Sequence, residues 1–146
     1  MLKGIDPILT PELLMHLCAM GHGEWVAVVD ANFTAHYLSQ GKPVVRLPGL
    51  SLACVSQAVL SVFPLATDVL QPVTLMHVCH TEADHRTNAQ QAVIELVNAL
   101  GLSSNSIEAI ERYAFYEKIK TASVIVQTGE GTAYGNVMFC KGVILL

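Results

Sequence analysis

The sequence predicts an α/β fold: one domain over residues 1–146, built as a three-layer α/β/α sandwich around a mostly parallel, mixed sheet. Short apolar runs alternate with stretches of helical periodicity, which is typical of strands joined by crossover helices. The length of 146 residues suits a single core, and no linker, repeat or low-complexity segment interrupts it. The last strand follows a tight turn at 129–131, which favours a mixed sheet.

The first half of the chain alternates helix and strand. Pro11 at the first helical position, preceded by the cap Thr10, predicts a helix that ends at Gly21. The apolar run at 25–29 then predicts a buried strand. Two more elements are expected in this half, a short strand over 44–47 and a buried helix that opens at the cap Ser51.

The second half continues the alternation. Apolar runs and turn residues predict four strands, at 73–79, 107–110, 123–128 and, interrupted near Gly142, 136–145. Two helices are expected between them, a long one from Thr81 to Gly101 and a shorter one over 114–122.

Composition restricts the partners. The formal charge is -4 and no Lys/Arg cluster occurs, so duplex nucleic acid is not an expected partner. Hydrophobic residues make up 52% of the chain and charged residues only 14%. Because one small domain does not need so many apolar residues for its core, we expect a homo-oligomer with buried subunit interfaces.

Neither a membrane span nor a signal peptide is expected. The uncharged stretch 47–67 contains two prolines and a glycine, which leave a helix too short to cross a bilayer. Asp6 and Pro7 interrupt the apolar N-terminal stretch, unlike a signal peptide. The four cysteines are scattered and form no C-x-x-C pair, which predicts reduced thiols in a cytoplasmic protein: Cys18, Cys54, Cys79 and Cys140.

A histidine between two glycines is the strongest candidate for chemistry. His22 follows the end of the first helix, and Asp30 stands at the carboxyl end of the next strand, where open α/β sheets place their ligands. We expect these two side chains to converge on one rim of the sheet. Because histidine titrates near neutral pH, they would form a proton-transfer pair there. The structural alternatives are a helix-capping histidine and an aspartate that caps a turn.

Two further motifs carry groups suited to polyhydroxyl ligands. Arg112 and Tyr116 are four residues apart, which places them on one face of a helix. Tyr134, Gly135 and Asn136 follow the tight turn and offer neutral donors and acceptors. The alternatives are an ion pair of Arg112 with one of the neighbouring glutamates, Glu108 or Glu111, and ordinary turn chemistry at 134–136.

Several ordered motifs resemble the L-fucose mutarotases, a family related to the D-ribose pyranases. The resemblance runs nearly end to end and is weakest over 65–106. The Gly-His-Gly and Arg-x-x-x-Tyr forms match the fucose branch better than the ribose branch. The matching motifs are Met1-Leu2-Lys3, Pro11-Glu12-Leu13-Leu14, Met20-Gly21-His22-Gly23, Asp30-Ala31-Asn32-Phe33, Arg112-Tyr113-Ala114-Phe115-Tyr116-Glu117 and Tyr134-Gly135-Asn136.

The resemblance implies a cofactor-free isomerase that interconverts the anomers of a monosaccharide, with L-fucose or a related sugar as substrate. It implies His22 as the catalytic proton shuttle. It also implies a ring or dimer with sites near subunit contacts. The residues implied to bind the sugar are Asp30, Arg112, Tyr116, Tyr134, Gly135 and Asn136.

The chain departs from that family at one position. Related mutarotases often have an aspartate where Ala66 stands, and Asp68 lies two residues further on. A sugar contact from this loop, and with it the substrate preference, is therefore left open.

A separate histidine-rich stretch raises the question of zinc. In the expected strand, His77 and Cys79 share one face and His80 lies on the other, and the five-residue spacing from His80 to His85 does not suit one helical face. No metal is therefore expected at His77, Cys79, His80 and His85. Three other functions remain open. A monosaccharide-binding protein for sugar transport or uptake, without catalysis, is distinguished by anomer-exchange measurements. A D-ribose pyranase is distinguished by the sugar that exchanges, and a zinc hydrolase by metal analysis.

Overall fold

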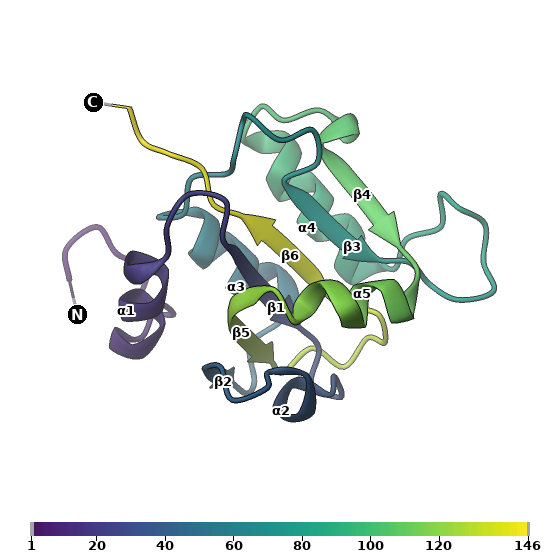
Figure 1. Cartoon of the computed structure of the whole chain (residues 1–146), viewed down its shortest axis with the longest axis horizontal. Coiled ribbons are helices and arrows are strands. Elements are labelled where there is room, and N and C mark those ends of the chain that lie inside the picture. The colour runs from purple at the N-terminus through teal and green to yellow at the C-terminus, as the bar shows by residue number, and fades with distance from the viewer. Residues whose placement is uncertain (1, 146) are drawn as a thin grey trace.

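Six strands form one sheet in the order β2-β5-β1-β6-β3-β4 in the computed structural model, which describes residues 2–145 (Figure 1). The pairs β1–β5, β2–β5 and β3–β4 are parallel, whereas β6 runs antiparallel to both neighbours, β1 and β3. The predicted mixed, mostly parallel sheet is confirmed. The strands are β1 Trp25–Val29, β2 Val44–Leu47, β3 Val73–Met76, β4 Ile107–Ile110, β5 Ala122–Thr128 and β6 Val137–Cys140.

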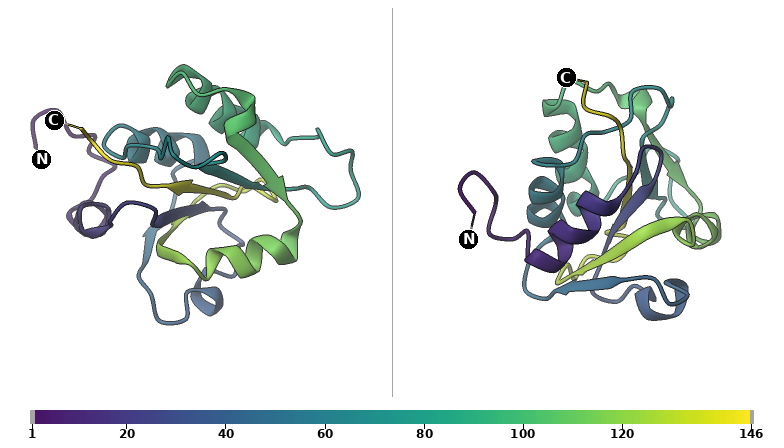
Figure 2. Two further views of the ribbon diagram at one scale, coloured as in Figure 1. Left: turned by 45° about the horizontal axis from the view of Figure 1, so that its top comes forward. Right: turned by 60° about the vertical axis from the view of Figure 1, so that its left-hand side comes forward.

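Helices cover both faces of the sheet and complete the three layers, as the left view of Figure 2 makes plain. The larger core packs α1, α3 and α4 against one face, and the smaller core packs α2 and α5 against the other. The helices are α1 Pro11–Ala19, α2 Ala35–Leu38, α3 Leu52–Leu60, α4 Asn88–Ala99 and α5 Arg112–Ile119, with a short 3-10 turn at Ser104–Ser106.

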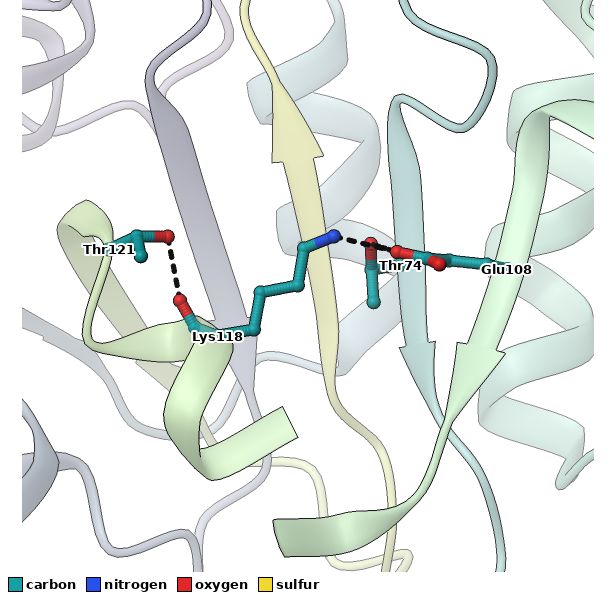
Figure 3. A network of polar contacts seen from close by, with 4 residues as sticks. All are labelled: Thr74, Glu108, Lys118 and Thr121. Atoms are coloured by element: carbon teal, nitrogen blue, oxygen red, sulfur yellow. Dashed lines mark hydrogen bonds and ion pairs between the residues drawn. The ribbon is translucent and has the colours of Figure 1, made fainter. Parts of the chain in front are cut away.

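A polar network fixes α5 across the second face (Figure 3). The Lys118 ammonium on α5 lies 2.6 Å from a carboxylate oxygen of Glu108 on β4, and the Thr74 hydroxyl on β3 donates to the same oxygen at 2.7 Å. Partial burial raises the pKa of Glu108, but the bonds from Lys118 and Thr74 outweigh it and hold the pKa below its ordinary value. The network therefore favours an ionised Glu108 and holds α5 over the sheet.

Element boundaries differ from the predictions in the middle of the chain. β3 ends at Met76, and α4 begins at Asn88, so 77–87 is a loop rather than the end of a strand and the start of a helix. Thr87, not Thr81, caps α4: its hydroxyl accepts from the Gln90 N–H, and the Gln90 side chain accepts from the Thr87 N–H. The four-residue α2 was not expected.

The other differences are small. α5 begins at Arg112 because the Glu111 carboxylate accepts from the N–H groups of Tyr113 and Ala114. It ends at Ile119, where β5 follows almost at once, and β6 ends at Cys140. None of the helices within 2–145 is long and apolar enough to span a membrane.

Candidate functional site

Asp30 and Asn136 form a reciprocal pair at the carboxyl end of β1. The Asn136 amide group donates to Asp30 Oδ2 at 2.8 Å, and the Asp30 backbone N–H donates to Asn136 Oδ1 at 3.0 Å. The other carboxylate oxygen accepts from the Asn32 N–H at 3.0 Å. Both side chains are buried. This pair joins the end of β1 to the start of β6, which is 106 residues away in the sequence.

Burial raises the pKa of Asp30, and the hydrogen bonds from Asn136 and Asn32 oppose that rise. A carboxylate with fixed donors on both oxygens is held in one orientation and keeps lone pairs for a further donor. Asp30 is therefore suited to anchor a ligand hydroxyl rather than to move freely as a base.

Tyr134 and Gly135 adopt backbone conformations that their neighbours hold in place. Tyr134 has φ of 64°, a left-handed conformation that is uncommon for a residue with a side chain. The buried Gln90 amide donates to the Tyr134 carbonyl at 2.9 Å and to the Met76 carbonyl at 2.6 Å. A Cβ on Gly135 would lie 3.0 Å from the Thr132 carbonyl oxygen, so only glycine fits without displacement.

Arg112 faces the same region from the start of α5. One terminal nitrogen donates to the Tyr113 hydroxyl at 2.8 Å, whereas its buried Nε has no hydrogen-bond partner among residues 2–145. A buried N–H without a partner is costly, and a ligand oxygen would satisfy it. The alternative ion pair with a glutamate is wrong, because Glu108 binds Lys118 and Glu111 caps α5.

Tyr116 and Cys79 complete this group. The Tyr116 ring packs edge-on against Phe33 with centroids 5.6 Å apart, and Arg112 lies in electrostatic range of Tyr116, Cys79 and Tyr134. A hydrogen bond with the Cys79 side chain, together with burial, raises the pKa of Tyr134. We call the six predicted ligand residues at this end of the sheet the carboxyl-edge cluster: Asp30, Arg112, Tyr116, Tyr134, Gly135 and Asn136.

His22 lies at the opposite edge of the sheet, so the prediction that it converges with Asp30 is wrong for a single chain. His22 precedes β1 and Asp30 follows it, and five strand residues extend about 17 Å. The antiparallel β6 ends beside His22: the Gly23 N–H donates to the Lys141 carbonyl at 2.8 Å. Figure 1 shows β6 pointing towards this end, whereas β3 and β4 point away from it.

Asp68 accompanies His22 at that edge. His22 Nε2 lies 3.0 Å from Asp68 Oδ1, and both side chains are exposed, by 42% and 59%. Ala66, at the position where related mutarotases often have an aspartate, is buried and directs its N–H to the Cys140 carbonyl. In this chain the carboxylate nearest to His22 thus comes from Asp68.

No group of three or more histidine, cysteine or acidic side chains with metal-binding geometry occurs in the described part of the chain, 2–145. His77 and Cys79 lie just after β3, and His80 and His85 lie in the exposed loop that leads to α4. This loop therefore lacks a preformed zinc site among the described residues.

The role of Gln90 was not predicted from the sequence. Gln90 supports the Tyr134 loop, and a capping signal for it was present in Thr87-x-x-Gln90. The proximity of Cys79 to Tyr134 and the pairing of Asp68 with His22 were not predicted either, because these partners are distant in sequence and no local pattern pairs them.

Comparison with known proteins gives consistent matches over the whole chain. Residues 3–144 match the RbsD / FucU transport protein family. An L-fucose mutarotase of Glaesserella parasuis is 36% identical over 143 residues, which cover 98% of this chain and 96% of that protein. The crystal structure of FucU from Bifidobacterium longum is 36% identical, with a TM-score of 0.91 over 98% of this chain and 100% of its own.

A fucose mutarotase from Streptococcus pneumoniae, solved in complex with L-fucose, is 28% identical, with a TM-score of 0.89 over 99% of this chain and 100% of that one. Matches of this extent cover both edges of the sheet, with the His22 loop and the carboxyl-edge cluster. The chain therefore belongs to the RbsD / FucU family.

Proposed function

We propose that this protein is a cofactor-free mutarotase that interconverts the α and β anomers of L-fucose or a closely related monosaccharide. The observation that carries the proposal is the carboxyl-edge cluster, where a fixed carboxylate, an amide, two phenols and an arginine Nε without a partner within 2–145 surround one region. Such groups suit the hydroxyls of a sugar. Two relatives, one named as an L-fucose mutarotase and one as a fucose mutarotase, are each 36% identical over 98% of this chain and support the same activity.

The reaction requires two proton movements. The anomeric hydroxyl loses its proton as its oxygen forms a double bond with the anomeric carbon. The bond from that carbon to the ring oxygen breaks, and the ring oxygen gains a proton. After rotation about the adjacent bond, the reverse steps close the ring on the other face. No redox change or net consumption of protons occurs, so one residue that first accepts and then returns a proton is sufficient.

His22 is the group matched to that task, because imidazole accepts and donates protons near neutral pH. Arg112 stays protonated at working pH and serves as a donor to sugar oxygens. Asp30 accepts a hydrogen bond from a sugar hydroxyl, while hydrogen bonds from Asn136 and Asn32 hold the Asp30 carboxylate in place. Tyr116, Tyr134, Gly135 and Asn136 line the sugar.

Since one chain keeps His22 and the carboxyl-edge cluster on opposite edges, we propose that each site is shared between two copies. Exposed apolar residues flank each half: Leu70, 79% exposed, follows Asp68, and Tyr113, 63% exposed, follows Arg112. Two different patches that meet can do so twice across a two-fold axis, which makes a dimer, or head to tail around a closed ring. This arrangement places His22 of one subunit over the cluster of its neighbour.

The test is anomer exchange measured by saturation-transfer NMR, with L-fucose and D-ribose first in a panel of sugars. Catalysed exchange of L-fucose, lost in His22→Ala with an unchanged circular dichroism spectrum, is the expected result. Binding of the sugar without faster exchange would instead identify a non-catalytic binding protein. Wild-type exchange in the folded His22→Ala variant would contradict the proton-shuttle role.

A further inference from the structure

Backbone contacts at the end of β6 hold the two loops that carry His22 and Asp68, so the pairing does not depend on the two side chains alone. The Asp68 loop is joined to the end of β6 by two backbone hydrogen bonds, which together make Leu65 and Lys141 an antiparallel bridge: the Ala66 N–H donates to the Cys140 carbonyl, and the Gly142 N–H donates to the Pro64 carbonyl. A Cβ on Gly142 would lie 2.5 Å from the Leu65 carbonyl oxygen, so the two segments touch.

The His22 loop is tied to the same residues. The Lys141 carbonyl accepts from the Gly23 N–H, and the Lys141 N–H donates to the Glu24 carbonyl, each at 2.8 Å. The Lys141 ammonium donates to two carbonyls at the end of α1, those of Leu17 and Met20. Residues 141 and 142 thus fix both loops, which brings together side chains 46 residues apart in the sequence.

We propose that Asp68 is a positioning residue that fixes the ring of His22, so that Nε2 carries the proton and Nδ1 is the base that faces the sugar. An ionised carboxylate can only accept, so the 3.0 Å contact requires Nε2–H as the donor. A neutral imidazole with Nε2–H has its lone pair on Nδ1, which can then act as the base. The inference rests on the proposed mutarotase function and specifies the chemistry of that site.

The proton balance follows from this assignment. Nδ1 takes the proton of the anomeric hydroxyl, and the ring becomes imidazolium while Nε2–H remains bonded to Asp68. The same Nδ1–H then passes its proton to the ring oxygen as the bond to the anomeric carbon breaks, which restores the neutral ring. Asp68 faces the positive charge only while the ring holds the extra proton, so it stabilises the transferring state without contacting the sugar.

Asp68→Asn tests this role, because a carboxamide can donate as well as accept and no longer requires a proton on Nε2. The maximal exchange rate should fall roughly tenfold, a part of the contribution of a general base. The half-saturating sugar concentration should stay unchanged. Asp68→Glu keeps a carboxylate and should recover part of the rate. The matched control Glu95→Gln removes one charge on the exposed side of α4 and should leave the rate unchanged.

The ring assignment has a readout that does not depend on turnover. Nitrogen-15 chemical shifts of His22, measured where the ring is neutral, should report a protonated Nε2 and an unprotonated Nδ1 in the wild type. In Asp68→Asn the fraction with a protonated Nδ1 should rise. The melting temperatures of the wild type and of Asp68→Asn should differ by less than about 4 °C, since an exposed ion pair contributes little to stability.

A protonated Nδ1 in the wild type would overturn the inference, as would an Asp68→Asn variant with an unchanged maximal rate or with reduced sugar affinity. If the wild type catalyses no anomer exchange, the proposed function fails. The chemical shifts then still decide whether Asp68 fixes the ring.

Discussion

Mixing two differently damaged variants tests whether the active site is shared between subunits. The first variant, His22→Ala, lacks the proton shuttle. The second, Arg112→Ala with Tyr134→Phe, keeps His22 but loses a charged and a neutral hydrogen bond to the sugar. These bonds are worth about 2 and about 1 kcal/mol, so the rate at low sugar concentration should fall roughly 100-fold. Each variant alone is therefore nearly inactive under these conditions.

The expected recovery follows from the geometry of β1. Because about 17 Å of strand separates His22 from Asp30, the proposed site requires residues from two chains. In oligomers assembled at random from equal amounts of both variants, half of the sites receive an intact His22, and half of those an intact cluster. About a quarter of the wild-type activity per site should return in a large ring, and about half in a mixed dimer purified through both tags. If His22 and the carboxyl-edge cluster of a site came from one chain, every site in the mixture would contain a substitution and no activity would be recovered.

The assay is saturation-transfer NMR at a sugar concentration well below half-saturation, on co-expressed variants with different affinity tags that are purified through both tags. Activity of the mixture no greater than the mean of the two parents would refute the shared site. Light scattering provides the control: a monomer at micromolar concentration would contradict the oligomer itself.

Three further predictions concern chemistry, stability and metal content. Arg112→Ala alone should raise the half-saturating sugar concentration about 30-fold and Tyr134→Phe alone about fivefold, and both should leave measurable activity at saturation, whereas His22→Ala loses the maximal rate. Loss of the maximal rate in Tyr134→Phe with unchanged affinity would place Tyr134 in the proton relay. Glu108→Gln should cost about 1 kcal/mol of unfolding free energy at pH 7. The pKa of Glu108 lies below 4.5 in the folded protein, so this difference in unfolding free energy should be present above about pH 4.5 and vanish as the pH falls through the pKa of the folded state. A difference that persists in acid would contradict the pairing of Glu108 with Lys118. Elemental analysis should find no stoichiometric zinc, and activity should survive chelation; one tightly held metal per chain would overturn this expectation.

The strands and most helices could be predicted because their signals are local. The apolar runs at 25–29 and 44–47 and the cap Thr10 before Pro11 need no tertiary information. The start of α4 could not be predicted in this way, since Thr81 and Thr87 are both plausible caps. The structure selects Thr87 because Gln90 then reaches the carbonyls of Met76 and Tyr134, two contacts that no local pattern contains.

The candidate site was predictable in its members but not in its arrangement. Asp30 and Asn136 come together through the antiparallel placement of β6 between β1 and β3. His22 lies close to Asp30 in the sequence, yet the intervening strand carries them apart. Asp68 meets His22 only because residues 141 and 142 fix both loops.

The antiparallel course of β6 also has a consequence for the order in which the protein can mature. β6 follows the five other strands in the sequence but lies in the middle of the sheet, between β1 and β3. Its start carries Asn136 to Asp30, and its end carries Lys141 to the His22 loop. During synthesis neither of the two proposed half-sites is complete before this strand inserts, because Asp30 then lacks Asn136 and the His22 loop lacks Lys141. A chain whose synthesis has not reached β6 therefore has neither proposed half-site in place, and we expect activity only after β6 has inserted between β1 and β3.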